Sequence, residues 1–382
     1  MATSSIRAAT EQDLDSLEII ESRCFSGDKL SRRSFKSLIK PGPHATSVLH
    51  CGGLLAGYSI VLFRTGTSLA RLYSIALDPD FRGRGLAQQL IAHVEAQARA
   101  RDCLFIRLEV RDDNPAAIAV YKKLGYQAFD SIAEYYEDGR YALRFEKPLH
   151  AETHTAISAS PSYYRQTTEF SCGPAALMMA MRDIDPLASL DRREELQIWR
   201  EATTIFMTTG HGGCSPHGLA LSALRRGFGV SLYINRSGTP FIDSVRSEEK
   251  RQVIDLVHQD FVEQLANYPV LIETNPLGPS QFRDILERHD HLLALISTWA
   301  LNRNRAPHWV YVSKTDAHFV YISDPDTNDS RWQSETDFMH VPISINAFIN
   351  MASFGRNRLR CLIAIHPAHS PVVTEHATAH VK

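Results

Sequence analysis

Apolar and polar residues alternate along the first 150 positions in a pattern of short strands and helices. Apolar residues recur every three or four positions between residues 84 and 101, which predicts an amphipathic helix. Two apolar runs flank a Gly-Gly pair within 47–63, which predicts a β-hairpin. A further helix is predicted over 114–125, because this segment opens on Asn-Pro and closes on glycine. The first half of the chain therefore reads as an α/β arrangement.

The second half has a different order of elements. An apolar helix is predicted to begin at residue 172, and the later strands follow one another without regular helical crossovers. That order is typical of an α+β fold. Two further helices of this half are predicted over 215–228 and 253–265. Its strands are predicted over 269–274, 291–298, 308–313 and 318–323.

Composition at two places marks the ends of these halves. Residues 150–162 contain almost no bulky apolar side chains, which predicts a linker. Residues 367–382 form a polar, histidine-containing tail that we expect to be unstructured. We therefore expect one domain over 1–149 and a second over 163–366, as the length of 382 residues also favours.

Charge and cysteine content narrow the class of protein. The formal net charge is -2, so the chain has no general attraction for nucleic acid or an anionic membrane. No apolar run approaches the ~18 residues of a membrane span, and the N-terminus lacks the pattern of a signal peptide. The six cysteines are sparse and show no paired spacing, which favours a reducing cytoplasm. Nothing in the sequence indicates an oligomeric state.

A glycine-rich turn lies between the strand that ends near Asp78-Pro79 and the helix that follows. Its sequence, Arg-Gly-Arg-Gly-Leu-Ala over 82–87, places glycines where a backbone can approach phosphates at a helix N-terminus. This strand, R-x-x-G-x-A turn and helix resemble the GNAT acetyltransferase family over residues 5–149. The resemblance implies a GNAT fold, with a mixed central sheet flanked by helices, and acetyl-CoA as cosubstrate. The cofactor-binding residues that it implies are Ile75, Ala76 and Leu77, through their backbones, with Arg82, Gly83, Arg84, Gly85, Leu86, Ala87 and Asn114.

Glu109 and Tyr121 are the candidate proton-transfer residues of this half. Acetyl transfer to an amine needs a base for the amine and an acid for the departing thiolate. Glu109 lies near the end of a predicted strand, and Tyr121 lies in the next helix. The segment 108–126 resembles the ribosomal-protein N-terminal acetyltransferase branch of the family, which implies Glu109 as base and Tyr121 as acid. A solvated glutamate and a half-buried core tyrosine are the alternative readings.

The strand before the glycine-rich turn supports the choice of Glu109. Some GNAT enzymes carry an acid on that strand, but residues 73–77 read Tyr-Ser-Ile-Ala-Leu and contain no carboxylate. The base is therefore expected elsewhere.

In the second half, Cys172 is the candidate nucleophile. It opens an apolar helix as Cys-Gly-Pro, and a helix N-terminus together with a histidine can activate a thiol. If two strands pair about a turn centred on residue 316, His308 faces Asp324 at ~5 Å. His318 lies six residues from Asp324 on the same strand, or ~20 Å away. His308 is therefore the preferred partner, and we expect His318 to face a packing layer or solvent.

These residues resemble those of papain-like cysteine peptidases of the type that processes bacteriocin precursors with double-glycine leaders. The resemblance covers residues 163–330 and rests on Gln166, Cys172-Gly-Pro, His308 and Asp324-Pro. It implies that Gln166 is an oxyanion donor, Cys172 the nucleophile, His308 the base and Asp324 its orienting partner. The transporter often fused to such peptidases has no counterpart here, and a buried structural cysteine is the alternative reading of Cys172.

A second cluster, His211, Cys214 and His217, offers three potential metal ligands in one loop, but no fourth lies nearby. We prefer to read it as a glycine-rich loop on the substrate side and expect no metal site.

Three functions follow from the sequence. The favoured one is acetylation of a peptide or protein amine, with a second domain that cleaves or binds peptides. The first alternative is acetylation of a small-molecule amine beside an inactive, peptide-binding second domain. The second alternative is a non-enzymatic acetyl-CoA sensor, against which Glu109 and Tyr121 argue.

Overall fold

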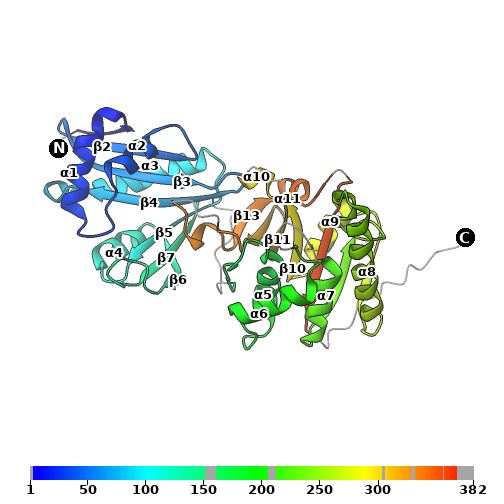
Figure 1. Ribbon diagram of the computed structural model, residues 1–382. Coiled ribbons are helices and arrows are strands. Elements are labelled where there is room, and N and C mark those ends of the chain that lie inside the picture. The colour runs from blue at the N-terminus through cyan, green and yellow to red at the C-terminus, as the bar shows by residue number, and fades with distance from the viewer. Residues whose placement is uncertain are drawn as a thin grey trace, which may run out of the picture. The chain divides into compact units, whose positions relative to one another are not determined.

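The computed structural model describes residues 3–150, 161–204, 212–302, 306–327, 332–355 and 357–367. Their contacts group the chain into two compact units (Figure 1). Unit 1 comprises residues 1–160 and 331–337, and unit 2 comprises residues 161–330 and 338–382. Most of the predicted linker over 150–162 and of the predicted tail over 367–382 lies outside the described residues, namely 151–160 and 368–382.

Unit 1 is built on a seven-stranded sheet in the order β1-β2-β3-β4-β5-β7-β6. All neighbours are antiparallel except β4 and β5, which run parallel. The strands are β1 (Ser4–Ala8), β2 (His44–Cys51), β3 (Leu54–Phe63), β4 (Leu69–Leu77), β5 (Phe105–Arg111), β6 (Gln127–Ile132) and β7 (Ala142–Pro148). The helices are α1 (Leu14–Cys24), α2 (Arg32–Ile39), α3 (Leu86–Arg99) and α4 (Pro115–Lys123). The predicted mixed sheet flanked by helices is confirmed.

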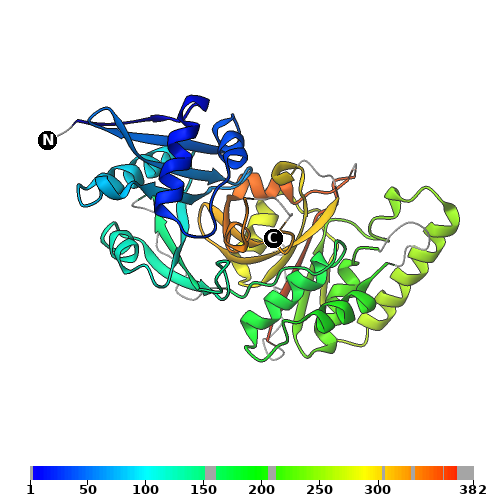
Figure 2. The ribbon, with the colours of Figure 1, turned by 60° about the vertical axis from the view of Figure 1, so that its left-hand side comes forward.

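Two apolar layers hold these helices against the sheet. On one face, Leu17, Phe35 and Ile60 join α1 and α2 to the middle strands, and Figure 2 shows the dark-blue α1 lying across them. On the other face, Val94 and Leu108 belong to a layer that packs α3 and α4. The sheet is thus covered on both sides, as a partly parallel sheet requires.

One part of the first face is polar. Arg71 of β4, Arg107 and Glu109 of β5 and Arg144 of β7 lie together there, and all four side chains are buried. Segment 332–337, orange-brown beside β5 and β7 in Figure 1, covers them and belongs to unit 1. The sequence boundaries had placed this segment inside the second domain. The local sequence pattern does not indicate that this segment joins unit 1, because its contacts are with residues about 200 positions away in the chain.

Unit 2 contains a second seven-stranded sheet, in the order β13-β12-β11-β10-β14-β8-β9. Its strands are β8 (Gly229–Ile234), β9 (Leu271–Glu273), β10 (Leu292–Ser297), β11 (Pro307–Thr315), β12 (Phe319–Ser323), β13 (Val341–Ser344) and β14 (Cys361–His366). Its helices are α5 (Cys172–Ile184), α6 (Arg192–Ala202), α7 (Pro216–Arg225), α8 (Glu248–Leu265), α9 (Pro279–Arg288), α10 (Trp299–Asn302) and α11 (Ile345–Met351). Pairing is antiparallel except between β8 and β9.

Helix α5 is the central helix of unit 2. All of its residues from Gly173 to Met181 are buried, and it packs against the sheet and against α6 and α7. Figure 1 shows α5, α6 and α7 grouped on one side of the sheet. A helix that is apolar on every side must be enclosed, which explains the continuous run Ala-Ala-Leu-Met-Met-Ala-Met.

Among the described residues, no helix combines the length and apolar composition needed to cross a lipid bilayer.

Candidate active sites

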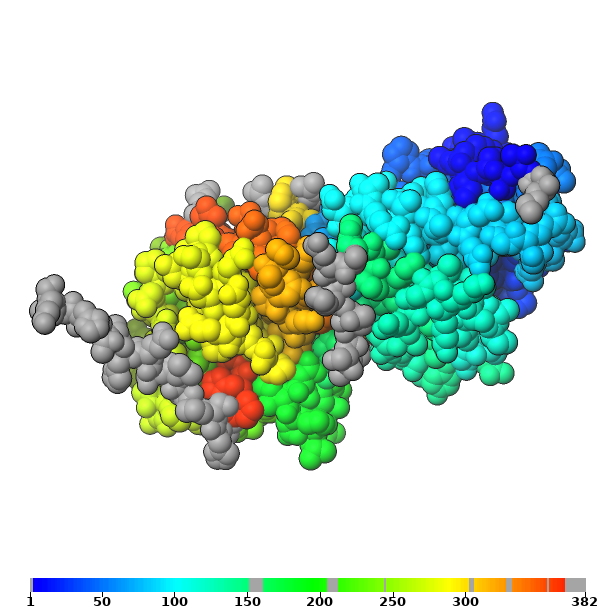
Figure 3. Space-filling view, turned by 180° about the vertical axis from the view of Figure 1, so that it is seen from behind, coloured from blue at the N-terminus to red at the C-terminus, as the bar shows by residue number. Residues whose placement is uncertain are grey.

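The glycine-rich turn of unit 1 leads directly into α3. Gly83 and Gly85 have φ values of 76° and 75°, and Gly85 is the N-cap of the helix. A side chain added at Gly83 would meet nothing within 4 Å, so the turn is open on that side. Arg82 and Arg84 are exposed beside it. The part of the chain around this turn and α3 is coloured sky blue to cyan in Figure 3. Free helix N–H groups, open glycines and two guanidinium groups fit the pyrophosphate of acetyl-CoA.

Strands β4 and β5 separate next to this turn. Their parallel pairing runs only from Leu69 opposite Phe105 to Arg71 opposite Arg107. Beyond it, residues 75–77 pair with β3 on one edge only, so their backbone groups on the other edge face the gap between β4 and β5. Such a gap suits an extended arm that carries amides, as pantetheine does. Asn114, between β5 and α4, is the N-cap of α4, and its Oδ1 accepts a hydrogen bond from the Ala117 N–H at 3.1 Å.

Glu109 points to the polar face of the sheet, where its side chain is only 4% exposed. Arg71 Nε lies 2.9 Å from Oε2, and the Ser334 hydroxyl donates to Oε1 at 3.1 Å. Burial alone would raise the pKa of Glu109, but the charge of Arg71 and hydrogen bonds from Thr336 and Arg71 lower it. Glu109 is therefore held as a carboxylate.

Tyr121 approaches the same region from the opposite face of the sheet. Its ring lies in the apolar layer under α4, with ring centroids 5.6 Å from Tyr126 and 6.3 Å from Phe145. Burial raises the pKa of its hydroxyl, so the phenol stays protonated. Glu109 and Tyr121 thus lie on opposite faces of the sheet, Glu109 on the polar face and Tyr121 in the apolar layer under α4.

In unit 2, Cys172 is the first residue of α5 and is partly exposed. The glycine after it has no space for a side chain, because an added Cβ would lie 3.0 Å from Leu219 and 3.2 Å from Trp309. The Cys-Gly-Pro sequence therefore lets the start of α5 pack closely while its N–H groups stay near the sulfur.

His308 and Asp324 form a buried pair beside Cys172. Asp324 Oδ1 lies 2.7 Å from His308 Nε2, and both side chains are less than a tenth exposed. Burial disfavours the charged imidazole, but the charges of Asp324 and Cys172 and hydrogen bonds to both raise the pKa of His308 well above its usual value. With Nε2 engaged by Asp324, Nδ1 is the ring atom left for the sulfur.

The hairpin that carries this pair differs in register from the prediction. Thr315 pairs with Val320, so the turn is centred between residues 317 and 318. A bulge follows Val312, and Tyr311 pairs with Ser323, so the pairs before the bulge are centred on residue 317 and not on residue 316. His308 and Asp324 are therefore not directly opposite, yet their side chains meet because diagonal neighbours on a sheet also reach each other. His318 is exposed to solvent in the turn, and solvent was one of the two environments expected for it.

Gln166 lies on the segment that precedes Cys172. Its backbone N–H donates to the Pro325 carbonyl at 3.0 Å, which ties this segment to the turn after Asp324. Its side-chain Nε2 donates to the Thr168 carbonyl at 2.9 Å, and the amide keeps a second hydrogen for another acceptor.

The sequence analysis missed Glu195 on α6, which is fully buried. Its carboxylate accepts from the Tyr164 hydroxyl at 3.0 Å, the Thr167 N–H at 2.7 Å, the Thr167 hydroxyl at 2.6 Å and the Ser171 hydroxyl. It thereby fixes the segment 164–171 that leads to Cys172. The only local signal was its position in the first turn of a helix, which is common for glutamate.

The loop with Cys214 and His217 offers no rival chemistry in its described part. Burial, with the neighbouring Cys172 sulfur, raises the pKa of Cys214 well above that of a free thiol. Burial lowers the pKa of His217 to about 4, helped by His258. His211 lies outside the described residues, and the described ones contain no cluster of metal-ligating side chains.

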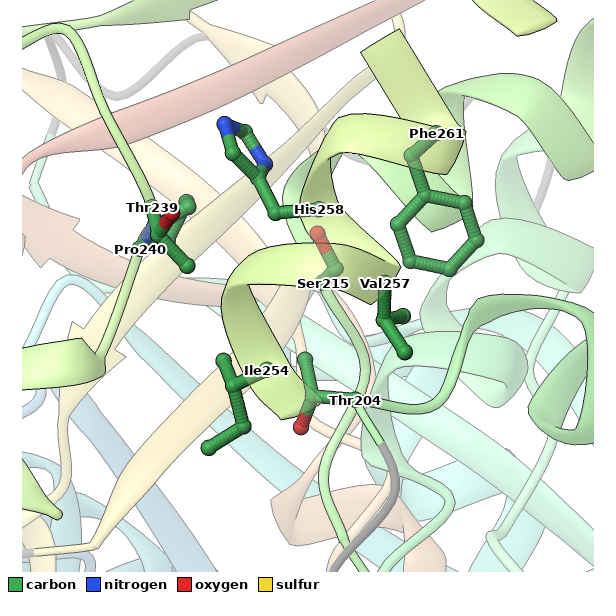
Figure 4. A pocket seen from close by; sticks show the side chains of 8 residues that line it. All are labelled: Thr204, Ser215, Thr239, Pro240, Ile254, Val257, His258 and Phe261. Carbon is green, nitrogen blue, oxygen red and sulfur yellow. The ribbon is translucent and has the colours of Figure 1, made fainter. Parts of the chain in front are cut away.

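The hollow next to this loop is too tight for a water molecule (Figure 4). None of the candidate catalytic residues lines it. Its lining residues are Thr204, Ser215, Thr239, Pro240, Ile254, Val257, His258 and Phe261.

Comparison with known proteins identifies both units. Residues 161–366, more than half of the chain, match the Peptidase_C39 like family, and residues 14–126 match the acetyltransferase (GNAT) family. Acetyltransferase ECA0875 of Pectobacterium atrosepticum is 48% identical over 60 residues, which are 16% of this chain and 43% of that protein. Acetyltransferase SG1711 of Sodalis glossinidius is 47% identical over 60 residues, 16% of this chain and 42% of that protein. The chain thus matches less than half the length of these curated relatives.

A solved structure also resembles the chain. The ribosomal-protein-S18-alanine N-acetyltransferase of Escherichia coli is 28% identical, with a TM-score of 0.36, over 41% of this chain and 100% of that one. GNAT acetyltransferases use acetyl-CoA, and the glycine-rich turn and the strand gap fit that cosubstrate. The chain belongs to the Peptidase_C39 like family and carries a GNAT acetyltransferase domain ahead of its peptidase-like domain.

Proposed function

We propose that the protein acetylates an amine of a peptide or protein with acetyl-CoA and that its second domain cleaves peptides through Cys172. The observation that carries the acetyltransferase proposal is the gap between β4 and β5 after the short parallel pairing, together with the Glu109 carboxylate on one face of the sheet and the protonated Tyr121 phenol in the layer on the other face. A base and an acid on opposite sides of one reaction centre are what aminolysis of a thioester needs.

When bound, acetyl-CoA supplies an acetyl thioester. The amine attacks the thioester carbonyl, and a C–N bond forms as Glu109 Oε1 accepts the proton of the amine. The C–S bond breaks, and the Tyr121 hydroxyl protonates the departing thiolate of coenzyme A. The raised pKa of Tyr121 keeps that proton in place until it is needed. The lowered pKa of Glu109 makes its carboxylate a weak base while Arg71 and the two hydroxyl groups hold it.

Mass spectrometry of amine libraries tests this function. Peptides with free N-termini and small polyamines are incubated with the full chain, with and without acetyl-CoA. Glu109→Gln and Tyr121→Phe should each lower turnover by ~10²-fold while acetyl-CoA affinity changes little. Acetylation confined to small amines would favour the small-molecule alternative, and unchanged turnover in Glu109→Gln would remove Glu109 as the base.

The peptidase proposal rests on the arrangement of Cys172, His308 and Asp324. The Cys172 thiolate attacks the peptide carbonyl, and the C–S bond forms as His308 protonates the leaving amine and the C–N bond breaks. Water then hydrolyses the thioester and releases the thiol. Asp324 keeps the imidazole oriented through Nε2, and the free amide hydrogen of Gln166 can stabilise the oxyanion.

Alkylation with iodoacetamide tests the nucleophile. Cys172 should react fastest below pH 7 because of its imidazolium partner, and His308→Ala should slow this reaction. The matched variant His318→Ala, in an exposed turn of the same hairpin, should leave the rate unchanged. Faster labelling of the buried Cys214, or an inert Cys172 in the folded protein, would contradict the proposal.

A further inference from the structure

Four arginines of unit 1 converge on segment 332–337. They come from the end of β3 and from β4, β5 and β7, and none is more than 9% exposed. In-register pairing puts Arg71 beside Arg107, and Glu109 beside Arg144, so they share one face of the sheet. We call this the arginine face, and its members are Arg64, Arg71, Arg107 and Arg144.

The segment meets the arginine face with backbone carbonyls and with side chains. The carbonyl of Trp332 accepts from Arg71 at 3.1 Å, that of Thr336 from Arg107 at 2.9 Å and that of Asp337 from Arg64 at 2.7 Å. Thr336 and Asp337 belong to a short 3-10 helix over Glu335–Asp337, so a turn of the backbone presents two of these carbonyls, with no requirement for particular side chains.

Side chains of the segment add charge complementarity. Asp337 Oδ2 lies 2.8 Å from Arg71, and Glu335 Oε2 lies 3.4 Å from Arg144. The Thr336 hydroxyl lies 2.9 Å from Arg144 Nε. A surface that offers guanidinium groups to both carbonyls and carboxylates favours an acidic peptide and disfavours a basic one.

The same segment closes access to Glu109. The Ser334 hydroxyl donates to Oε1, the atom proposed to take the proton of an acceptor amine. With the Glu109 side chain only 4% exposed, an incoming amine reaches this oxygen only when Ser334 leaves it. Segment 332–337 therefore stands where an acceptor peptide has to lie.

We propose that the arginine face is the acceptor-binding surface of the acetyltransferase, that it selects acidic peptides, and that segment 332–337 occupies it as an internal competitor. This inference rests on the proposed acetyltransferase function and on Glu109 as the base. The acceptor class follows from this chemistry: a peptide with carboxylate and hydroxyl side chains near its free amine.

The test weakens the segment without changing a catalytic residue. The full-length double variant Ser334→Ala/Asp337→Asn removes the contact to Glu109 and the ion pair to Arg71. We expect kcat/KM for acidic peptides to rise at least tenfold, mainly through a lower KM. The matched double variant Ser280→Ala/Asp284→Asn, on exposed positions of α9, should behave as wild type.

A second measurement does not depend on how well the variant folds. A synthetic hexapeptide with the sequence of residues 332–337, acetylated at its N-terminus, is added to wild-type protein. It should inhibit acetyl transfer competitively with the acceptor peptide and not with acetyl-CoA. A peptide with both acidic positions changed to lysine should not inhibit.

The outcomes separate this inference from the proposed function. If transfer depends on Glu109 but the double variant is no faster than wild type, the inference alone is overturned. The same holds if basic peptides are acetylated as well as acidic ones. Absence of transfer to any amine in wild type and double variant overturns both. Transfer by the double variant where wild type shows none supports both.

Discussion

Buried carboxylates act in opposite ways in the two units, depending on the group beside each. Glu109 lies beside an arginine, which cannot release its proton, so the pair lowers the pKa of Glu109 and weakens it as a base. Asp324 lies beside a histidine, which can release its proton, so the pair raises the pKa of His308. In the proposed mechanisms, the first carboxylate therefore needs to be freed before it acts, whereas the second holds its partner in the protonated form.

Asp324→Asn should change how stability depends on pH. The raised pKa of His308 in the folded state means that its contribution is complete below ~6.5, the unfolded value, and is lost as the pH rises through the folded-state pKa. Removing the carboxylate should flatten this decline. Urea unfolding of both proteins from pH 6 to pH 9 measures it, with the exposed Glu287→Gln as control. An unchanged decline in Asp324→Asn would show that the pair does not hold the proton.

At the scale of elements, helix N-termini carry the candidate chemistry in both units. Helix α3 begins after a glycine with positive φ, and α5 begins at the nucleophilic cysteine itself. Both use the unpaired N–H groups and partial positive charge of a first turn. The elements around them supply the rest: a separated strand pair for α3, and the β11–β12 hairpin for α5.

Two glycines allow a matched test of the α3 turn. Gly85 and Gly53 have φ values of 75° and 84°, and an added Cβ meets nothing closer than 3.8 Å at either. Substitution by alanine should cost each ~1 kcal/mol of unfolding free energy through backbone strain alone. Only Gly85→Ala should also weaken acetyl-CoA binding, as measured by calorimetry. Equal affinity in the two variants would remove the turn from the cofactor site.

Glu195 links α6 to segment 164–171, which leads to Cys172, so a change at Glu195 should affect the reactivity of Cys172. Glu195→Gln keeps the size of the side chain but loses the anionic acceptor for four donors, which should cost about 1–3 kcal/mol. Alkylation of Cys172 should slow as the segment loosens. The comparison variant is Glu194→Gln, the neighbouring glutamate that pairs with Arg226. A loss of stability with no change in the alkylation rate would confine Glu195 to a structural role.

At the scale of the whole molecule, unit 1 is discontinuous in sequence. It takes residues 332–337 from the second half of the chain, and these supply acceptors for four buried arginines. Each charge-assisted hydrogen bond contributes about 1.5–3 kcal/mol. The GNAT domain therefore depends on a piece of chain that follows most of the peptidase-like domain.

A fragment of residues 1–150 should show this dependence. We expect it to bind acetyl-CoA through the glycine-rich turn but to unfold at a lower urea concentration than unit 1 does in the full chain. Hydrogen exchange of β5 amides as a function of urea measures unit 1 in both. Adding the hexapeptide of residues 332–337 should partly restore protection, whereas the lysine-substituted peptide should not. Equal stability of fragment and full chain would contradict the role of the segment.

Features that depend on neighbouring residues could be predicted from the order of amino acids alone. The glycine-rich turn before α3, the Cys-Gly-Pro start of α5 and the two fold classes follow from local spacing and turn chemistry, which depend on neighbouring residues. The pairing of His308 with Asp324 was also predicted, although its register was wrong because the turn lies later in the chain than the symmetry of the two strands indicates.

The surroundings of Glu109 and Cys172 depend on contacts between distant segments of the folded chain. Charged residues at alternate positions of β5 and β7 indicate a polar face, but nothing in a strand specifies which distant segment will cover it. Glu195 meets its four donors only after α6 has packed beside α5. Charge pairing and burial depend on chain segments brought together by folding, so the protonation and accessibility of the candidate catalytic groups could not be read from the sequence.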